Sequence, residues 1–210
     1  MKITEEELKL RRERIIRCAF KLFCQRGIDR VTIKDVAKAA DVSESTIYRY
    51  YKNKPKLVLA TMHLLWHSIG LELQESIEAT VCYDQMSGYQ QLDAWIEGCR
   101  QLYQKNADYI LFAYESKLYL QRSGIKLTQA QYDSLMSELE EPFVAALEKG
   151  KRDGSLSSRS DSIDLFYTLW GVLRGYIVKI VLYKALCEDG GPWESRYDLV
   201  KEGILRALAA

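Results

Sequence analysis

Apolar residues recur along this chain at spacings of three and four residues, which is the period of an amphipathic α-helix. Near the N-terminus Ile16, Phe20 and Phe23 follow this spacing, and Gly27 then provides a residue type that commonly follows a helix C-terminus. The chain has only three prolines and twelve glycines, few of them inside periodic segments. The pattern therefore predicts an all-α protein of about nine helices.

Three capping signals follow this first helix at short intervals. Thr32 and Asp35 have the spacing of a capping box ahead of a short helix. Ser43 can cap a second short helix, and Asn53 can cap a longer one that accepts Pro55 in its first turn. Two short helices joined by a tight turn predict a helix-turn-helix. The two short helices are expected over residues 33–40 and from Ser43 to about Tyr51.

Beyond residue 60 the helical spacing continues over longer segments without internal repeats or low-complexity tracts. All four tryptophans and 18 of the 23 aromatic residues lie in this part. Pro142 is expected to kink or divide one of the helices. The expected helices cover residues 53–78, 88–104, 107–119, 128–153, 160–187 and 193–209.

Charge divides the chain into a basic head, residues 1–60, and an acidic body. The basic head carries 15 Lys and Arg against 8 acidic residues, a net charge of +7, although the whole chain has a net charge of only +1. A basic head on an acidic body favours a polyanionic partner, of which nucleic acid is the commonest. For the arginines at positions 11–17, a solvated helix face is the alternative interpretation.

A segment of the basic head, VTIKDVAKAADVSESTIYRYYKNKPKLV, closely resembles the DNA-binding segment of the TetR family of transcriptional regulators. The match runs over about residues 15–65 and is strongest over residues 43–57. It departs from the family pattern at Asp41, Tyr51 and Pro55, where glycine, phenylalanine and a glutamate or similar residue are usual. Aspartate tolerates the left-handed backbone region and proline fits a first helical turn, so the fold is expected to survive these departures.

The resemblance implies an N-terminal three-helix, helix-turn-helix domain over residues 1–52 and a larger helical effector-binding and dimerisation domain over residues 53–210. It implies a cytoplasmic transcriptional regulator, most simply a repressor, that binds a palindromic operator in double-stranded DNA as a homodimer. Release by a small apolar or aromatic effector would follow the family pattern. The alternative is a constitutive DNA-binding dimer without an effector.

In a helix-turn-helix the second helix lies in the major groove, with its first residues near base edges and its later residues near the backbone. Arg49 is the expected base reader, because a guanidinium can make two hydrogen bonds to guanine. For Thr32 and Ser43 a capping role is the alternative to DNA contact, and the two roles are compatible. Tyr51 is expected in the core. The expected phosphate contacts are Tyr48, Tyr50, Lys52 and Lys54, with the hydroxyls of Thr32 and Thr46, and the candidate base contacts are Lys34, Ser43, Glu44, Ser45 and Arg49.

Two apolar stripes near the C-terminus predict a dimer interface. Gly171 and Gly175 permit close approach of helices, and two helices from each of two subunits can form a four-helix interface. The competing interpretation is that both stripes face the subunit's own core, and the family resemblance favours the dimer. The expected interface residues are Phe166, Trp170, Ile177, Val181, Tyr197, Val200, Ile204 and Leu208.

The aromatic enrichment of the acidic body predicts an apolar ligand cavity. Ordinary core packing is the alternative interpretation for each residue assigned to its wall. The expected wall residues are Trp66, Trp95, Tyr103, Phe112, Tyr114 and Trp170, with Glu115 as a polar anchor.

Other functional classes receive little support from the sequence. His63 and His67 share a helix face but no Cys/His cluster accompanies them, so neither a metal site nor a cofactor is expected. No G-x-S-x-G, P-loop or G-x-G-x-x-G motif is present, which argues against an enzyme.

The sequence also argues against export and membrane insertion. The acidic, polar start has no apolar signal region, so the protein is expected to remain in the cytoplasm. The most apolar stretch, residues 163–186, contains four charged residues, and a buried helix is therefore expected rather than a membrane span. The five cysteines form no C-x-x-C pair, and most are expected to be small core residues.

Overall fold

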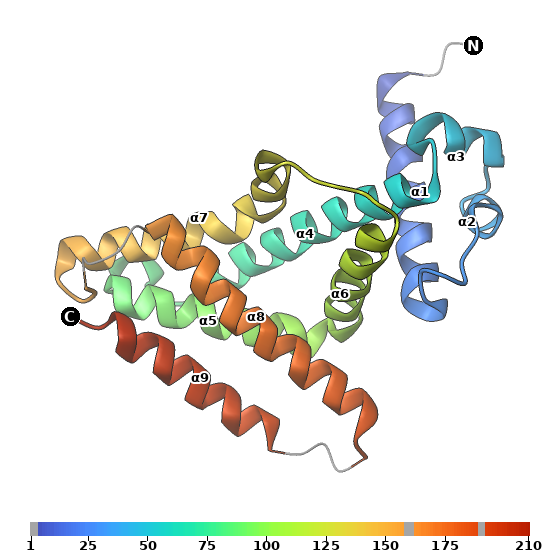
Figure 1. The fold of residues 1–210 in the computed structure, drawn as a ribbon. Helices are drawn as coiled ribbons and strands as arrows, with labels where there is room; N and C mark the ends of the chain where they lie inside the picture. Colours follow the sequence, from blue (N-terminus) through green and yellow to red (C-terminus); the bar gives the residue numbers. More distant parts are fainter. Residues whose placement is uncertain (1–3, 158–161, 189–191) are drawn as a thin grey trace. The chain divides into compact units, whose positions relative to one another are not determined.

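The structure is a computed structural model that describes residues 4–157, 162–188 and 192–210. Within these ranges the chain is helical, with one isolated β-bridge between Leu156 and Ala209 and no β-strand (Figure 1). The all-α prediction is therefore confirmed. The elements are α1 (Glu5–Arg26), α2 (Ile33–Ala39), α3 (Glu44–Tyr51), α4 (Lys54–Glu78), the 3-10 helix η1 (Tyr83–Gln85), α5 (Gly88–Lys105), α6 (Ala107–Arg122), α7 (Gln129–Asp153), α8 (Ser162–Leu186) and α9 (Trp193–Leu208).

The helix boundaries agree closely with the periodicity of the sequence. The largest difference is at the end of α6, which continues to Arg122 rather than stopping at residue 119. α7 remains one helix through Pro142. The short helix η1 follows Cys82, whose backbone is left-handed. It was not predicted, because three residues are too few to show a helical spacing of apolar positions. The predicted start of the eighth helix at residue 160 lies outside the described residues.

Side-chain caps define the two short helices of the basic head. The Thr32 hydroxyl accepts a hydrogen bond from the Asp35 amide at 3.1 Å, and the Asp35 carboxylate accepts one from the Thr32 amide at 2.8 Å. Ser43 caps α3 by accepting from a backbone amide at 3.3 Å. Asp41 has a φ of 51° in the turn between α2 and α3. The predicted capping box, the second cap and the left-handed turn residue are all confirmed.

The chain forms two compact units. Unit 1 comprises Met1–Trp66 and Leu111–Gln131, and unit 2 comprises His67–Ile110 and Tyr132–Ala210. α4, α6 and α7 therefore contribute residues to both units. The first half of α4 and most of α6 belong with the helix-turn-helix, whereas the sequence placed the functional domain boundary at residue 52.

The core of unit 1 joins the helix-turn-helix to α6. Ile47 of α3 is fully buried in this core, and α2 packs against both α1 and α3. Phe112 of α6 stacks on Phe23 of α1, with ring centroids 6.0 Å apart, and meets Phe20 edge to face at 5.2 Å. Tyr51 is only 8% exposed, which confirms its predicted place in the core.

Trp95 of α5 lies at the centre of an aromatic cluster in unit 2. Its ring meets Phe143, Phe166 and Trp170 edge to face at centroid distances of 5.0, 6.3 and 5.8 Å. Its indole N–H donates to the carbonyl oxygen of Leu139 at 3.2 Å, which satisfies the one polar atom that burial of a tryptophan brings into the core. α8 and α9 pack on α5 and on each other around this cluster.

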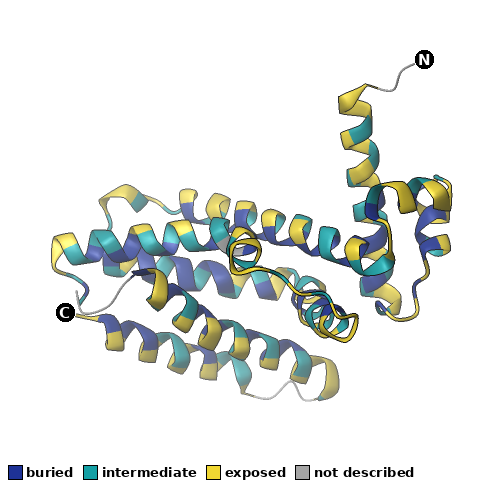
Figure 2. Cartoon of the chain, turned by 45° about the horizontal axis from the view of Figure 1, so that its top comes forward, coloured by how far each residue is buried: buried dark blue, intermediate teal, exposed yellow. Residues whose placement is uncertain are grey.

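The two apolar stripes predicted as a dimer interface lie in the core of unit 2. A side chain that is already covered within its own subunit has almost no surface left to offer a partner. Figure 2 shows how buried and exposed positions alternate along the helices. Phe166, Trp170, Ile177, Val181, Tyr197, Ile204 and Leu208 are buried, and Val200 is half-buried.

Among the described residues, α8 is the one helix that is long and apolar enough to cross a membrane, judged by length and composition alone. Its inner face is nevertheless a core face of unit 2, and its Lys184 pairs with Glu194 while Lys179 lies 5.3 Å from the ring centroid of Trp193. Only 33% of its most apolar stretch is buried. The outer face of α8 therefore leaves apolar surface exposed.

The cysteines are more accessible than predicted. Only Cys99 is fully buried, and burial raises the pKa of its thiol. Cys82 is exposed in the loop before η1, and the other three cysteines are partly buried. The expectation that most cysteines lie in the core is wrong, because the apolar periodicity around them did not distinguish the core of a helix from its boundary.

Candidate nucleic-acid interface and ligand groove

α3 presents a polar face to solvent because its two buried residues, Ile47 and Tyr51, lie four positions apart on the opposite face. The exposed face carries Glu44, Ser45 and Arg49 along with Tyr48, whose side chain is 48% exposed. An eight-residue helix with one face anchored and one face polar and accessible has the form needed to enter the major groove.

All eleven predicted DNA-binding residues belong to unit 1, and none is buried. Eight of them are exposed, on α2, on α3 and just outside their ends. Thr46, Tyr50 and Lys54 are half-buried. The structure therefore leaves the predicted surface accessible while fixing three of its members against neighbouring groups.

A cluster of three hydroxyls surrounds the N-terminus of α3. The Ser43 hydroxyl lies 2.8 Å from the hydroxyl of Ser45 and 2.9 Å from that of Thr46. A hydroxyl can donate and accept at once, so a capping Ser43 can keep its role while its neighbours turn toward an external acceptor. The arrangement supports the view that capping and DNA contact are compatible.

Lys54 is held within unit 1 instead of extending freely into solvent. Its ammonium group donates to the carbonyl oxygen of Asp29 at 3.3 Å and lies 5.3 Å from the ring centroid of Tyr119. Burial lowers the pKa of Lys54, and the charge of Asp29 acts in the opposite direction. To reach a phosphate, Lys54 would have to give up these contacts, which distinguishes it from the exposed Lys52.

Arg12 of α1 lies beside the second helix of the motif, a placement that sequence reasoning missed. Its guanidinium carbon is 5.0 Å from the ring centroid of Tyr50, and that of Arg49 is 5.1 Å from the same centroid. The available signal was the run of arginines at positions 11–17, whose alternative interpretation was a solvated helix face. The structure selects Arg12 from that run because the fold brings its turn of α1 next to α3.

Glu115, predicted as the polar anchor of a ligand cavity, has another partner in the structure. Its carboxylate accepts a hydrogen bond from the backbone amide of Ile28 at 2.7 Å, just beyond the end of α1. Nearby, Arg122 pairs with Asp29 at 3.1 Å. These contacts attach α6 to the loop between α1 and α2, so Glu115 supports the basic head.

Five of the six aromatic residues predicted as a cavity wall are buried in the two units. Trp66 and Phe112 are buried in unit 1, and Trp95, Tyr103 and Trp170 are buried in unit 2. Tyr114, by contrast, is 45% exposed on α6. Core packing, the alternative given for each of these residues, describes the five buried ones.

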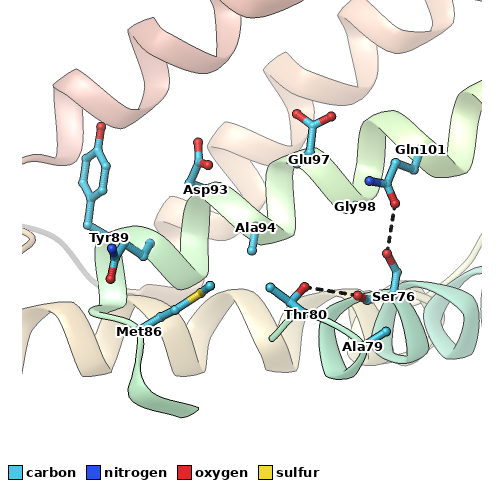
Figure 3. Close-up of a pocket in the computed structure, with 11 residues that line it drawn as sticks. Ser76, Ala79, Thr80, Met86, Tyr89, Asp93, Ala94, Glu97, Gly98 and Gln101 are labelled. Atoms are coloured by element: carbon cyan, nitrogen blue, oxygen red, sulfur yellow. Dashed lines mark hydrogen bonds between the residues drawn. The ribbon is translucent and has the colours of Figure 1, made fainter. Parts of the chain in front are cut away.

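A groove of about 600 Å³ lies between the end of α4, η1 and α5 in unit 2 (Figure 3). None of the seven predicted wall residues lines it. The sequence did contain a signal for this surface, because four residues with polar groups recur every four positions on one face of α5: Tyr89, Asp93, Glu97 and Gln101. The lining residues are Ser76, Ala79, Thr80, Met86, Tyr89, Gln90, Asp93, Ala94, Glu97, Gly98 and Gln101.

The groove combines apolar and polar side chains. Met86 and Ala94 supply apolar surface, and Ser76 donates a hydrogen bond to the Gln101 side chain at 3.2 Å (Figure 3). The carboxylates of Asp93 and Glu97 lie 2.8 and 3.4 Å from the ammonium group of Lys201. Small-molecule sites commonly combine apolar surface with fixed polar groups, and this groove offers both.

The two histidines have separate surroundings. His67 lies 2.6 Å from a Glu138 carboxylate oxygen, and burial lowers the pKa of His63. Among the described residues no group of three or more His, Cys, Asp or Glu side chains is placed to hold a metal ion.

Comparison with known proteins gives the same picture for the N-terminal part of the chain. Residues 15–61 match the family model of the bacterial regulatory proteins, tetR family. The HTH-type transcriptional regulator BetI of Brucella anthropi is 38% identical over 71 residues, which are 34% of this chain and 37% of that regulator. The HTH-type transcriptional regulator TtgR of Pseudomonas putida is 39% identical over 62 residues, 30% of each chain. The matches thus span about a third of the curated relatives.

Solved structures extend the likeness to the whole fold. The fatty acid degradation regulator FadR from Bacillus halodurans superposes with a TM-score of 0.69 at 14% identity, covering 92% of this chain and 94% of that one. The structure of RolR in complex with resorcinol superposes with a TM-score of 0.64 at 18% identity, covering 98% and 90%. At this level of identity the likeness concerns the fold alone.

Proposed function

We propose that this chain, whose residues 15–61 match the family model of the bacterial regulatory proteins, tetR family, is a DNA-binding transcriptional regulator, and that it acts as a repressor that binds a palindromic operator as a homodimer. The observation that carries the proposal is the exposed polar face of α3, with the hydroxyl cluster at its N-terminus and Arg49 one turn later. The groove in unit 2 supports a second part of the proposal, release from DNA by a small molecule with an apolar or aromatic body.

The direct test is selection of duplexes from a random pool, followed by filter binding of the selected duplex at several salt concentrations. Phosphate contacts give binding that falls steeply with salt, and base contacts give a preference for one sequence over others. A repressor of this kind should select a palindrome whose half-sites are about one helical turn, ~34–36 Å, or a small multiple apart. Binding that is equal for all duplexes would contradict the proposal.

Replacing Arg49 by alanine should relax the base preference at one position of each half-site, at a cost of about 1–3 kcal/mol against the preferred base. In the proposed complex the Arg49 guanidinium would make two hydrogen bonds to a guanine, and alanine would remove both. Binding competitions between the selected duplex and single-base variants measure the effect.

Tyr48→Phe is the matched comparison for Arg49→Ala. Tyr48 is exposed on the same helix, and its proposed role is to donate one hydrogen bond to a phosphate. Its loss should weaken binding to all duplexes alike without changing the preferred sequence. If both variants keep wild-type affinity and base preference at every salt concentration, α3 is not the recognition helix.

The proposed dimer uses the outer faces of α8 and α9. Val172 and Leu199 are 53% and 67% exposed there, and Gly171, Gly175 and Gly203 have open space where a side chain would begin. Apolar side chains beside small residues allow two helices to approach closely. A second copy of the chain that covers this surface would form a four-helix interface, with the two recognition helices paired by twofold symmetry.

The proposed effector site is the groove lined by α4, η1 and α5. A ligand that releases the operator must, by linkage, bind more weakly when DNA is bound, and by the same factor, typically ~5–150-fold. Ligands can be found by thermal-shift screening, and calorimetry with and without the selected duplex then measures the factor. Ala94→Trp should fill the groove and abolish the ligand effect while DNA binding of the ligand-free protein stays unchanged.

The alternative is a constitutive DNA-binding dimer. The alternative is favoured by the burial of five of the six aromatic residues expected to line a cavity, because core packing also explains their positions. Equal ligand affinity in the presence and absence of the selected duplex would support this alternative, because a ligand without differential affinity shifts no equilibrium.

A further inference from the structure

Two guanidinium groups from different helices lie against one tyrosine ring in unit 1. Arg49 belongs to α3 and Arg12 to α1, and their guanidinium carbons lie 5.1 and 5.0 Å from the centroid of the Tyr50 ring. The Nη2 group of Arg49 also donates a hydrogen bond to the hydroxyl oxygen of Tyr50, with the nitrogen and oxygen 3.4 Å apart. Tyr50 is half-buried, unlike Tyr48 two positions earlier.

From this geometry we infer that Tyr50 is a positioning residue for Arg49, and that Arg12 is a further DNA-contacting residue supplied by α1. The inference rests on the proposed DNA-binding function. It changes the role of Tyr50 from a phosphate ligand to the support of the base reader, and it adds a cation that lies outside the helix-turn-helix.

The face of an aromatic ring attracts a cation through its quadrupole, and arginine can also stack on it. Arg49 otherwise has a long side chain with many rotamers. A ring that holds it near one orientation lowers the conformational entropy that a base contact would cost.

Tyr51 fixes the ring of Tyr50 in turn. The two rings meet edge to face, with centroids 6.2 Å apart and planes at 74°. The Tyr51 hydroxyl donates to the backbone carbonyl oxygen of Arg12 at 3.3 Å. Burial raises the pKa of Tyr51 to about 12, so its phenol remains a hydrogen-bond donor at neutral pH. The usual phenylalanine of the family pattern would lack this link between α3 and α1.

The two arginines have different tasks in the proposed complex. Arg49 lies on the exposed face of α3 that would meet base edges. Arg12 lies on α1, which flanks the recognition helix, and its charge would neutralise one phosphate. The mutual repulsion of the two cations falls when the phosphates of bound DNA surround them, so the arrangement favours the DNA-bound state.

The experiment compares Tyr50→Leu, Tyr50→Trp and Arg12→Ala with wild type and with Tyr48→Phe, on the duplex selected by wild type and on its single-base variants. Tyr50→Leu should reduce discrimination about 2- to 5-fold at the same operator position that Arg49→Ala relaxes. Tyr50→Trp restores an aromatic face without the hydroxyl, and it should keep the wild-type preference. Arg12→Ala should lower the slope of log affinity against log salt by about 1 with no change in preferred sequence.

The inference is overturned if Tyr50→Leu keeps full discrimination and weakens binding to every duplex alike, as Tyr48→Phe does, because Tyr50 would then be a phosphate ligand. It is equally overturned if Tyr50→Trp, with a wild-type melting curve, loses the discrimination. An unchanged salt slope in Arg12→Ala removes Arg12 from the interface. Failure of the proposed function is a separate result, since wild type would then show no base preference at all.

Discussion

Replacing Val172 and Leu199 together by glutamate should convert the proposed dimer to a monomer and lower its affinity for the selected palindrome by about 10²–10⁴-fold. Both side chains lie on the outer faces of α8 and α9, where they are 53% and 67% exposed. In a dimer they would be covered, and a buried carboxylate without a partner is strongly unfavourable. The affinity falls because each half-site is then bound separately.

The exposure of both positions makes the variant informative. In a monomer both glutamate side chains would be exposed to water, so they should not disturb the fold. The far-UV circular dichroism spectrum and the melting curve of the monomer should therefore be those of a folded protein. Glutamate at Ile177 or Ile204 would not give a clean result, because these side chains are buried in unit 2 and their replacement would disrupt its core. Multi-angle light scattering across a range of protein concentrations measures the mass.

Val81→Glu is the matched control. Val81 is 82% exposed in the loop before η1, away from α8 and α9 in the sequence, and the same chemical change there should leave both the mass and the operator affinity unchanged. A dimer mass for the Val172→Glu/Leu199→Glu variant at micromolar concentration would show that the interface lies elsewhere.

The basic head could be predicted from sequence because its information is local. A capping box acts over three residues, as Thr32 and Asp35 show, and a left-handed turn position such as Asp41 depends only on its own backbone. Helix boundaries likewise follow from the apolar period. Accordingly α2 and α3 were found with their caps, and so were the surfaces that they expose.

The packing partners of the body could not be predicted in the same way. The period of α8 identified Phe166 and Ile177 as members of an apolar stripe, but a stripe has the same period whether it meets its own subunit or a second one. α8 is apolar on more than one face, with Val172 on the outside, so periodicity alone could not choose between the two. The resemblance favoured the dimer, and the structure places the stripe in the core.

Contacts between distant segments were the least accessible to sequence reasoning. Glu115 is an isolated acidic residue in α6, and nothing near it in sequence indicates that it would meet the amide of Ile28 across 87 positions. Arg12 was one arginine in a run of four, and only the fold selects it to lie against Tyr50. The groove residues of α5 had a visible four-residue spacing, yet a polar helix face gives the same pattern.

Unit 1 places α6 in the same core as the helix-turn-helix, and Phe112→Ala should therefore destabilise unit 1 by about 3–5 kcal/mol. Phe112 is almost completely buried, stacked on Phe23 and in edge contact with Phe20 of α1. Alanine removes both ring contacts and leaves a cavity that helices on several sides would have to close. The packing of α3 should weaken at the same time, because α2 packs on α1 and Tyr51 of α3 hydrogen-bonds to α1.

Urea unfolding monitored by circular dichroism measures the change in the free energy of unfolding, and Tyr114→Ala is the control for it. Tyr114 lies two positions along the same helix and is 45% exposed, so removing its ring should change stability by no more than about 0.5 kcal/mol. If Phe112→Ala is as stable as Tyr114→Ala, the packing of Phe112 against α1 does not stabilise the basic head. A fragment ending at Trp66 lacks Phe112, Glu115 and Arg122 together, so it should be much less stable than unit 1 of the whole chain.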